Sequence, residues 1–253
     1  MSDRLALLAD RAVRSAFGRE IGFDIEYHAA IGSTQDRARE LGRAGFGTPV
    51  IVVADHQTSG HGRGDKSWLS EPGASLLASW VFRPAPAEPA LFVLLAGVAV
   101  TRALRPFGAA DLGLKWPNDV WLTGGKIAGC LAHGAADHLV IGIGINFSQR
   151  ELPREIAETA TTLTRAGHEI DRLALLARLS AELDRVADPA NRADGLAEWR
   201  KRSITLGREV EVLGSGTDTF RGKATALAED GALVVETAYG QQRVLAGEVR
   251  VLG

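Results

Sequence analysis

Cysteine is almost absent from this sequence, which has only Cys130 in 253 residues. An internal disulfide is therefore excluded, and the apolar surroundings of Cys130 favour a buried, unreactive thiol over a nucleophile. Net charge is also small, because 29 Lys and Arg residues stand against 31 Asp and Glu residues, a formal balance of -2. This balance provides no general attraction to polyanions. We therefore expect no nucleic-acid partner, and any nucleotide must bind at a local site.

Long hydrophobic runs are missing as well. The most apolar stretch, residues 90–100, is far shorter than the roughly 18 to 20 residues needed to cross a bilayer, so we expect a buried helix there. The first 17 residues carry Asp3, Arg4, Asp10 and Arg11, and these charges interrupt the apolar core that a signal peptide requires. We therefore expect a cytoplasmic protein without a membrane partner.

Hydrophobic periodicity predicts an α+β fold. We expect a mixed or antiparallel sheet with helices on one face, because short apolar strands are joined by hairpin turns instead of alternating regularly with helices. Helices are expected at 5–17, 33–45, 89–104, about 173–183 and 196–203. Strands are expected at 49–55, 75–82, 112–116, 119–122, 126–133 and 138–147, with a tight hairpin at 123–125.

The pattern changes from about Ile204 onward. Five short strand-like runs follow one another, at 208–213, 219–228, 232–238, 242–247 and 249–252, and Asp230-Gly231 is a strong hairpin signal. The sequence thus predicts two domains, a larger one over 1–203 and a small β-barrel over 204–253.

The stretch GHGRGDKSW, residues 60–68, allows several interpretations. A phosphate-binding P-loop needs glycine directly before its lysine and must open a helix. Here Asp65 takes the glycine's place, and Pro72 and Gly73 follow where a helix should run. An adhesion role for the Arg-Gly-Asp tripeptide would require an extracellular protein. A glycine-rich surface loop without a ligand remains the alternative on this stretch alone.

A second segment, KWPNDVWLTGGKIAG at 115–129, gathers Lys115, Asn118, Asp119 and Lys126. Taken alone, Lys126 would be a solvated hairpin lysine. Three segments together, however, closely resemble the catalytic core of biotin protein ligases in their order and separation. They are GHGRGDKSW, KWPNDVWLTGGKIAG and VIGIGINF. The resemblance extends to IGSTQDRA, ADHQTSG and ATTLTRAG, and the C-terminal strands resemble that family's SH3-like domain. It covers nearly all of the chain from Ile31 onward.

This resemblance implies a two-step activity. The carboxylate of biotin attacks the α-phosphate of ATP to give biotinyl-5′-adenylate and pyrophosphate, and a lysine of a biotin carboxyl carrier domain then accepts biotin as an amide. The first step brings two anions together, so cations must lie between them. Lys126 and Arg63 match the family's catalytic positions. Mg²⁺ is expected with ATP, and Asp119, beside Asn118, offers it an oxygen ligand.

The resemblance also assigns ligand contacts by position. The loop at 60–68 is expected to close over the ligands and keep water from the adenylate, so Arg63→Gly should release it to label other lysines. The implied biotin contacts are Ser33, Thr34, Gln57, Gly60, His61, Gly62, Arg63, Trp68, Lys126, Gly129, Leu131 and Gly142. The implied nucleotide contacts are Arg63, Trp68, Lys115, Asn118, Lys126 and Asn146.

The loop departs from the family's commonest form at two positions. Arginine often stands where this chain has His61, whose charge depends on pH, and glycine often stands at Asp65, which could pair with Lys66 or Arg63. Three rivals remain: a lipoate or octanoate ligase, a non-catalytic binder, and a biotin-dependent repressor. The short segment before Ser33 favours a ligase without a DNA-binding domain. Monomer and homodimer stay open, and so does the role of the C-terminal barrel.

Overall fold

A seven-stranded sheet forms the centre of the protein. The computed structural model describes residues 4–45, 49–86, 88–149, 151–152, 154, 156–213 and 219–252. Strands lie in the order β1-β2-β3-β7-β6-β5-β4, with β1 and β2 parallel and the other neighbours antiparallel. Their bounds are β1 Asp24–His28, β2 Val50–Ala54, β3 Ser75–Phe82, β4 Leu112–Lys115, β5 Asp119–Leu122, β6 Gly125–Gly134 and β7 Leu139–Asn146.

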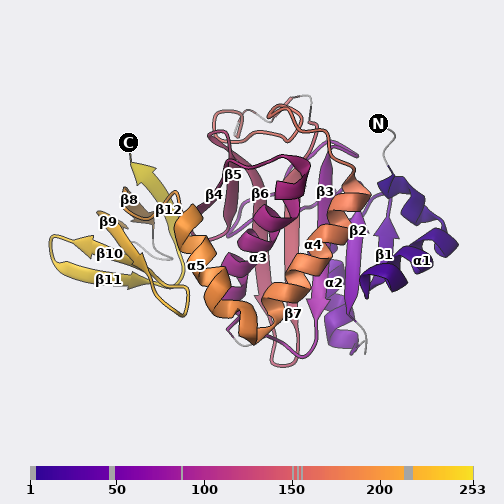
Figure 1. The fold of residues 1–253 in the computed structure, drawn as a ribbon, viewed down its shortest axis with the longest axis horizontal. Helices are drawn as coiled ribbons and strands as arrows, with labels where there is room; N and C mark the ends of the chain where they lie inside the picture. Colours follow the sequence, from indigo (N-terminus) through magenta and orange to yellow (C-terminus); the bar gives the residue numbers. More distant parts are fainter. Residues whose placement is uncertain are drawn as a thin grey trace.

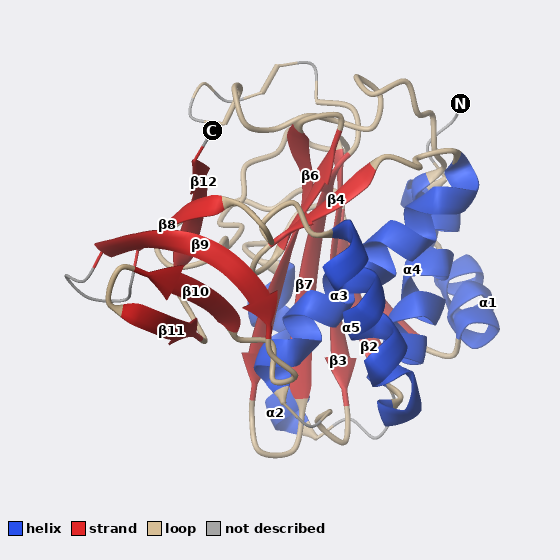
Figure 2. Ribbon diagram, turned by 60° about the vertical axis from the view of Figure 1, so that its left-hand side comes forward, coloured by secondary structure: helices blue, strands red, loops and turns tan. Residues whose placement is uncertain are grey.

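Helices cover both faces of this sheet (Figures 1 and 2). Helix α3 packs on β6, and α4 and α5 pack on α3, whereas α2 packs on the opposite face over β2, β3 and β7. The bounds are α1 Arg11–Ile21, α2 Thr34–Ala44, α3 Pro89–Leu104, α4 Arg172–Ala187 and α5 Arg192–Arg202, with 3-10 turns at Leu5–Ala9, Arg105–Phe107 and Pro189–Asn191. The predicted α+β class is confirmed, and α2 adds a helix on the second face.

The strands place different residues on the two faces because side chains alternate along a strand. On β7, Ile141, Ile143 and Ile145 belong to the main core beneath α3, while Gly142 and Gly144 point to the other side. The α2 face has only a small apolar cluster, made of Ala38, Leu41, Val50, Val52, Val81 and Val140. Space remains on that face beside α2, and the functional site lies there.

The C-terminal strands form a second, antiparallel sheet in the order β11-β10-β9-β8-β12. It docks on the segment between β4 and β5, where the indole Nε1 of Trp116 donates to the carbonyl of Gly231 at 3.0 Å and the Trp116 amide donates to Thr205 Oγ1 at 3.0 Å. The bounds are β8 Glu209–Leu213, β9 Thr219–Leu227, β10 Leu233–Thr237, β11 Gly240–Val244 and β12 Glu248–Leu252.

Two local elements differ from the sequence-based expectation. The single helix expected at 5–17 is a 3-10 turn followed by α1, because the Asp10 side chain accepts from the amides of Ala12 and Val13 and so starts a new helix. Strand β1 was not predicted, since DIEYH has no apolar run. None of the helices in the described part of the chain has the length and apolar character that a bilayer span requires.

Candidate functional site

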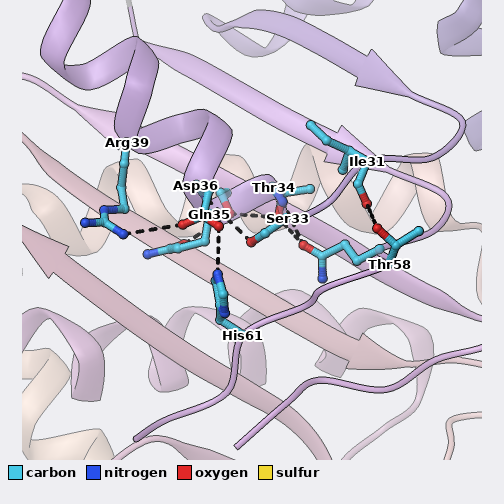
Figure 3. A network of polar contacts seen from close by, with 10 residues as sticks. Ile31, Ser33, Thr34, Gln35, Asp36, Arg39, Thr58 and His61 are labelled. Carbon is cyan, nitrogen blue, oxygen red and sulfur yellow. Dashed lines mark hydrogen bonds and ion pairs between the residues drawn. The ribbon is translucent and has the colours of Figure 1, made fainter. Parts of the chain in front are cut away.

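The N-terminus of α2 forms a polar corner. Ser33 is the N-cap, accepting from the Asp36 amide, and the next residue, Thr34, donates from both its amide and its hydroxyl to Gln57 Oε1, at 2.7 and 2.9 Å. The Thr34 hydroxyl also lies 2.9 Å from Ser79 Oγ on β3. These bonds fix the orientation of the Gln57 amide group. Figure 3 shows Ser33 and Thr34 at this corner.

The loop at 60–68 joins β2 to β3, as predicted, and is itself a small hairpin. The amide of Gly62 donates to Lys66 O at 2.7 Å, and the amide of Trp68 donates to Gly60 O at 2.9 Å. Gly64 at its tip has φ 64, a left-handed conformation that favours glycine. The loop is therefore a hairpin between two strands, whereas a P-loop opens a helix.

Two ion pairs attach this loop to different parts of the protein. His61 Nε2 lies 2.7 Å from Asp36 Oδ2 in the first turn of α2 (Figure 3). Lys66 Nζ lies 2.7 Å from Glu248 Oε2 on β12 of the C-terminal sheet. Lys66 thus pairs across the domains and not with its neighbour Asp65, which was one of the expected alternatives. The loop bridges the α2 corner and the C-terminal sheet.

Trp68 lies over the glycines of β6 and β7. A Cβ atom at Gly144 would lie 2.5 Å from Cε2 of the indole, and one at Gly129 would lie 3.1 Å from Cζ3. Lys126 Nζ is 5.8 Å from the centroid of the same ring. Glycine on the site face of the sheet therefore allows Trp68 to lie flat against the strands.

Three cations, Arg63, Lys115 and Lys126, lie at the end of the site away from the α2 corner. Lys126 Nζ lies 2.6 Å from Asp119 Oδ1 on the neighbouring strand, and Lys115 lies over the indole of Trp121. The side chain of Arg63 makes no hydrogen bond or ion pair to any of the described residues, and burial lowers its pKa, against the opposing effect of Asp119 and Glu248. Burial likewise lowers the pKa of Lys115. The positive charges of Arg63 and Lys115 are therefore not fully balanced by neighbouring carboxylates. A bound polyanion would supply the missing negative charge.

Two predicted nucleotide contacts, both asparagines, also support the backbone. Asn118 Nδ2 donates to Cys130 O at 3.1 Å, and Asn146 Nδ2 donates to the carbonyls of Lys126 and Thr161 at 3.4 and 3.3 Å. Asn146 therefore helps to place the strand that carries Lys126. Cys130 is fully buried, and burial raises the pKa of its thiol to about 12, so the expected inert role fits.

One cavity of about 510 Å³ brings the predicted residues together. Its wall includes all of them except Gly60, namely Ser33, Thr34, Gln57, His61, Gly62, Arg63, Trp68, Lys115, Asn118, Asp119, Lys126, Gly129, Leu131, Gly142 and Asn146. Gly60 is buried behind the wall, where a Cβ would press on Trp68 O and Gln57 Nε2. Its lack of a side chain thus serves the packing of the loop.

Sequence reasoning missed several lining residues. Gln35, only 6% exposed, donates to Leu131 O and accepts from Ser79 Oγ, and the absent side chain of Gly142 leaves it room. Because Gln35 directly follows Thr34 on α2, its position in the sequence could have indicated that it lines the site. Glu248 and Leu213 also line the cavity, from the C-terminal sheet. No local pattern in the sequence marks these two, because only the docking of the domains brings them there.

Comparison with known proteins identifies the family. Residues 28–146 match the Biotin/lipoate A/B protein ligase family, and residues 205–252 match the Biotin protein ligase C terminal domain. The chain is 35% identical over 266 residues to the biotin--[acetyl-CoA-carboxylase] ligase of Mycobacterium tuberculosis, covering 98% of both chains. The chain belongs to the biotin protein ligase family. The resemblance found in its motifs is therefore confirmed.

Solved structures of biotin protein ligases share the fold. The enzyme from Aquifex aeolicus, in complex with biotin and ATP, superposes with a TM-score of 0.76 at 32% identity, covering 90% of this chain and 98% of that one. The enzyme from Leishmania major, in complex with biotinyl-5-AMP, gives a TM-score of 0.64 at 25% identity, covering 90% and 98%. The cavity described above thus lies in a fold that binds these ligands in its relatives.

Asp119, the predicted Mg²⁺ ligand, does not belong to a cluster of metal-binding side chains among the described residues. Nowhere in the described ranges do three or more His, Cys, Asp or Glu side chains gather so as to hold a metal ion. Asp119, the predicted Mg²⁺ ligand, already pairs with Lys126. Since Mg²⁺ in nucleotide enzymes is held largely by phosphate and water oxygens, one carboxylate fits an ion that arrives with its nucleotide and not a resident ion.

Proposed function

We propose that this protein is an ATP-dependent biotin ligase that forms biotinyl-5′-adenylate and transfers biotin to a lysine of a biotin carboxyl carrier domain. The observation that carries the proposal is the layout of the cavity, with a fixed polar corner at one end and the cations Arg63, Lys115 and Lys126 at the other. The wall contains four Lys or Arg side chains but only two carboxylates among the described residues. A ligand with a neutral polar head and an anionic end fits this asymmetry.

Biotin matches the two ends of the cavity. Its ureido group would bond in the polar corner at Ser33, Thr34 and Gln57. Thr34 and Gln57 are oriented by their mutual hydrogen bonds, and Ser33 by the bond it accepts from the Asp36 amide. Its apolar rings and tail would lie between Trp68 and the glycine-bearing strands β6 and β7. This places the carboxylate of biotin near Lys126, where the phosphates of ATP would also arrive.

The first step joins the two anions. A carboxylate oxygen of biotin attacks the α-phosphorus of ATP, the bond to the bridging oxygen of pyrophosphate breaks, and pyrophosphate leaves. Lys126, a compact charge, would bridge carboxylate and α-phosphate, and Arg63, with its planar fork, would bind phosphate oxygens. Asp119 holds the Lys126 ammonium in place at 2.6 Å. Mg²⁺ bound to ATP would neutralise phosphate charge near Asp119 and Asn118.

The second step uses the amine of the carrier lysine. The amine attacks the acyl carbon of the adenylate, the bond to the phosphate oxygen breaks, and AMP leaves. The adenylate is a mixed anhydride that water would hydrolyse, so it must be held under cover until the carrier arrives. The loop at 60–68 would provide this cover, because its anchors lie on both sides of the cavity. The carrier is expected to belong to a biotin-dependent carboxylase.

The deciding experiment measures products from the purified protein with ATP, Mg²⁺ and biotin. Biotin-dependent release of pyrophosphate, together with the mass of biotinyl-5′-adenylate, is expected. Addition of a carrier domain should then give a biotinylated product, and the same carrier with its acceptor lysine replaced by arginine should remain unlabelled. Lipoate in place of biotin is the control for the related ligases. If no pyrophosphate forms with biotin, or if lipoate serves equally well, the proposal is wrong.

A further inference from the structure

The position of Arg63 depends on the backbone of its loop. Its side chain makes no hydrogen bond or ion pair within the described chain, and glycines at 62 and 64 flank it. Glycine neighbours leave the backbone free to rotate. Because the two glycines do not fix the backbone by themselves, the contacts that hold the loop on either side of Arg63 also determine where its guanidinium lies in the cavity.

The nearer anchor is the pair of His61 and Asp36. The His61 imidazole is two residues before Arg63 and lies 2.7 Å from one oxygen of Asp36, while the other oxygen receives Arg39 Nη1 at 3.3 Å (Figure 3). Asp36 lies in the first turn of α2, the turn that Ser33 begins. The pair therefore attaches the loop to the same corner that would bind the head of biotin.

We propose that Asp36 and His61 form a positioning pair, which holds the loop on α2, keeps Arg63 over the adenylate, and holds it more firmly when His61 is protonated. The inference rests on the proposed function, since it concerns the retention of an intermediate that the protein must first make. Neither side chain needs to touch the reacting atoms for this role. Both act through the position of Arg63.

The charges around His61 set the direction of the pH effect. Helix α2 contributes Asp36 and Arg39, β6 contributes His133, and the loop itself contributes Arg63, Asp65 and Lys66. Arg39, His61 and His133 also border a smaller cavity beside the main one, so the imidazole is accessible from solvent. Burial, followed by Arg39 and Arg43, lowers the pKa of His133 and so disfavours a second positive charge beside His61.

Protonation changes the character of the contact. A protonated imidazole and a carboxylate form an ion pair, whereas a neutral imidazole can only donate a neutral hydrogen bond. Because the charged form of a histidine is favoured by acid, the anchor should weaken as the pH rises. Both side chains are 47% exposed, and the effect of an exposed pair is small. We expect adenylate release to quicken ~2- to 5-fold from the acid end to the alkaline end of the range tested.

The test measures how fast preloaded, labelled adenylate leaves the protein when excess unlabelled biotin is added, from pH 5.5 to 8. Asp36→Asn should release adenylate faster and without the pH slope. His61→Arg, which keeps its charge at every pH, should release it slowly and without the slope. His61→Gln should release it rapidly at all pH values. Arg39→Gln removes the other partner of Asp36 and is the matched control, which should retain the slope.

The outcomes separate the two proposals. A wild-type protein that makes no adenylate contradicts the proposed function itself. A wild-type protein that makes adenylate but releases it with the same pH slope as Asp36→Asn or His61→Arg overturns the positioning pair. If Asp36→Asn does not fold, by thermal unfolding, the comparison of the two His61 variants decides, because residue 61 lies on the exposed loop.

Discussion

The two faces of the central sheet use the same strands for opposite purposes. Beneath α3, the isoleucines of β7 and Trp80 of β3 pack into a continuous apolar core. On the α2 face, the alternate positions of β7 are Gly142 and Gly144, and the space they leave is taken by Gln35 and Trp68. A strand of sequence GIGIN therefore stabilises the fold with one set of residues and makes room for side chains of the candidate site with the other.

This difference means that stability and activity are separable residue by residue along one strand. Substitutions that face the core should lower the free energy of unfolding and leave ligand contacts intact, provided the protein remains folded. Substitutions that face the site should weaken ligand contacts and leave the free energy of unfolding nearly unchanged.

Replacement of Lys126 should have the largest effect. Lys126→Ala removes the cation proposed to bridge the carboxylate and the α-phosphate, and loss of one such stabilising group costs about 10²- to 10³-fold in turnover. The rate of biotin-dependent pyrophosphate release measures this loss. Thermal unfolding should change little, because Lys126 is partly exposed on the site face. A variant that is fully active would remove Lys126 from the mechanism.

Adjacent residues on β7 provide the sharpest contrast. Ile143→Ala should lower the free energy of unfolding by about 2 to 5 kcal/mol, because it opens a cavity in the core. Its neighbour Gly144→Ala should instead displace Trp68, whose indole lies 2.5 Å from the new Cβ, and weaken biotin binding. Chemical denaturation and calorimetric titration with biotin measure the two effects. Equal losses of stability in both variants would contradict the separation of the faces.

A buried hydrogen bond on the core face should have a smaller effect. The indole of Trp80 donates to Ser180 Oγ on α4 at 3.0 Å, and Ser180→Ala would leave this buried donor without its partner. We expect a loss of about 1 to 3 kcal/mol in the free energy of unfolding. Adenylate formation at a temperature well below the unfolding transition should be unchanged. A marked loss of activity there would show that the core face influences the site directly.

The smallest effect is expected at the ion pair between the domains. Lys66 and Glu248 are 65% and 42% exposed, and exposed pairs contribute only about 0.2 to 1 kcal/mol. Glu248→Gln should therefore quicken adenylate release only a few-fold at low salt, with an unchanged unfolding temperature. Raising the salt concentration should shrink the difference from the wild type. A difference that persists at high salt would point to a contact other than this ion pair.

Much of the fold was predictable because its strands are strongly apolar and bounded by turn residues. The run at 75–82 was expected as a strand and forms β3 with the same bounds, and the hairpin at 123–125 has positive φ at Thr123 and Gly124. Strand β1 was missed because its charged residues hide the alternation, and its parallel pairing with β2 depends on the rest of the sheet. Helix α5 starts at Arg192, earlier than the predicted 196.

The candidate site was predictable to the extent that its residues lie in compact motifs. The loop at 60–68 and the segment at 115–129 each supply several lining residues, and both were found. The ion-pair partners of the loop residues were not predictable. His61 and Asp36 are separated by 25 residues, and Lys66 and Glu248 by 182 residues. Such contacts arise from the packing of elements, which a single sequence does not specify. The roles assigned to individual site residues remain predictions.

The indole of Trp116 has a consequence for engineering. Its hydrogen bond to Gly231 O, and that of the Trp116 backbone amide to Thr205 Oγ1, tie the C-terminal segment to the short turn that presents Lys115, Asn118 and Asp119 to the cavity. The C-terminal sheet is therefore not an interchangeable module. A chimera that exchanges it must carry over the acceptor positions that meet this tryptophan, or the turn bearing these cavity-lining side chains will lose its shape.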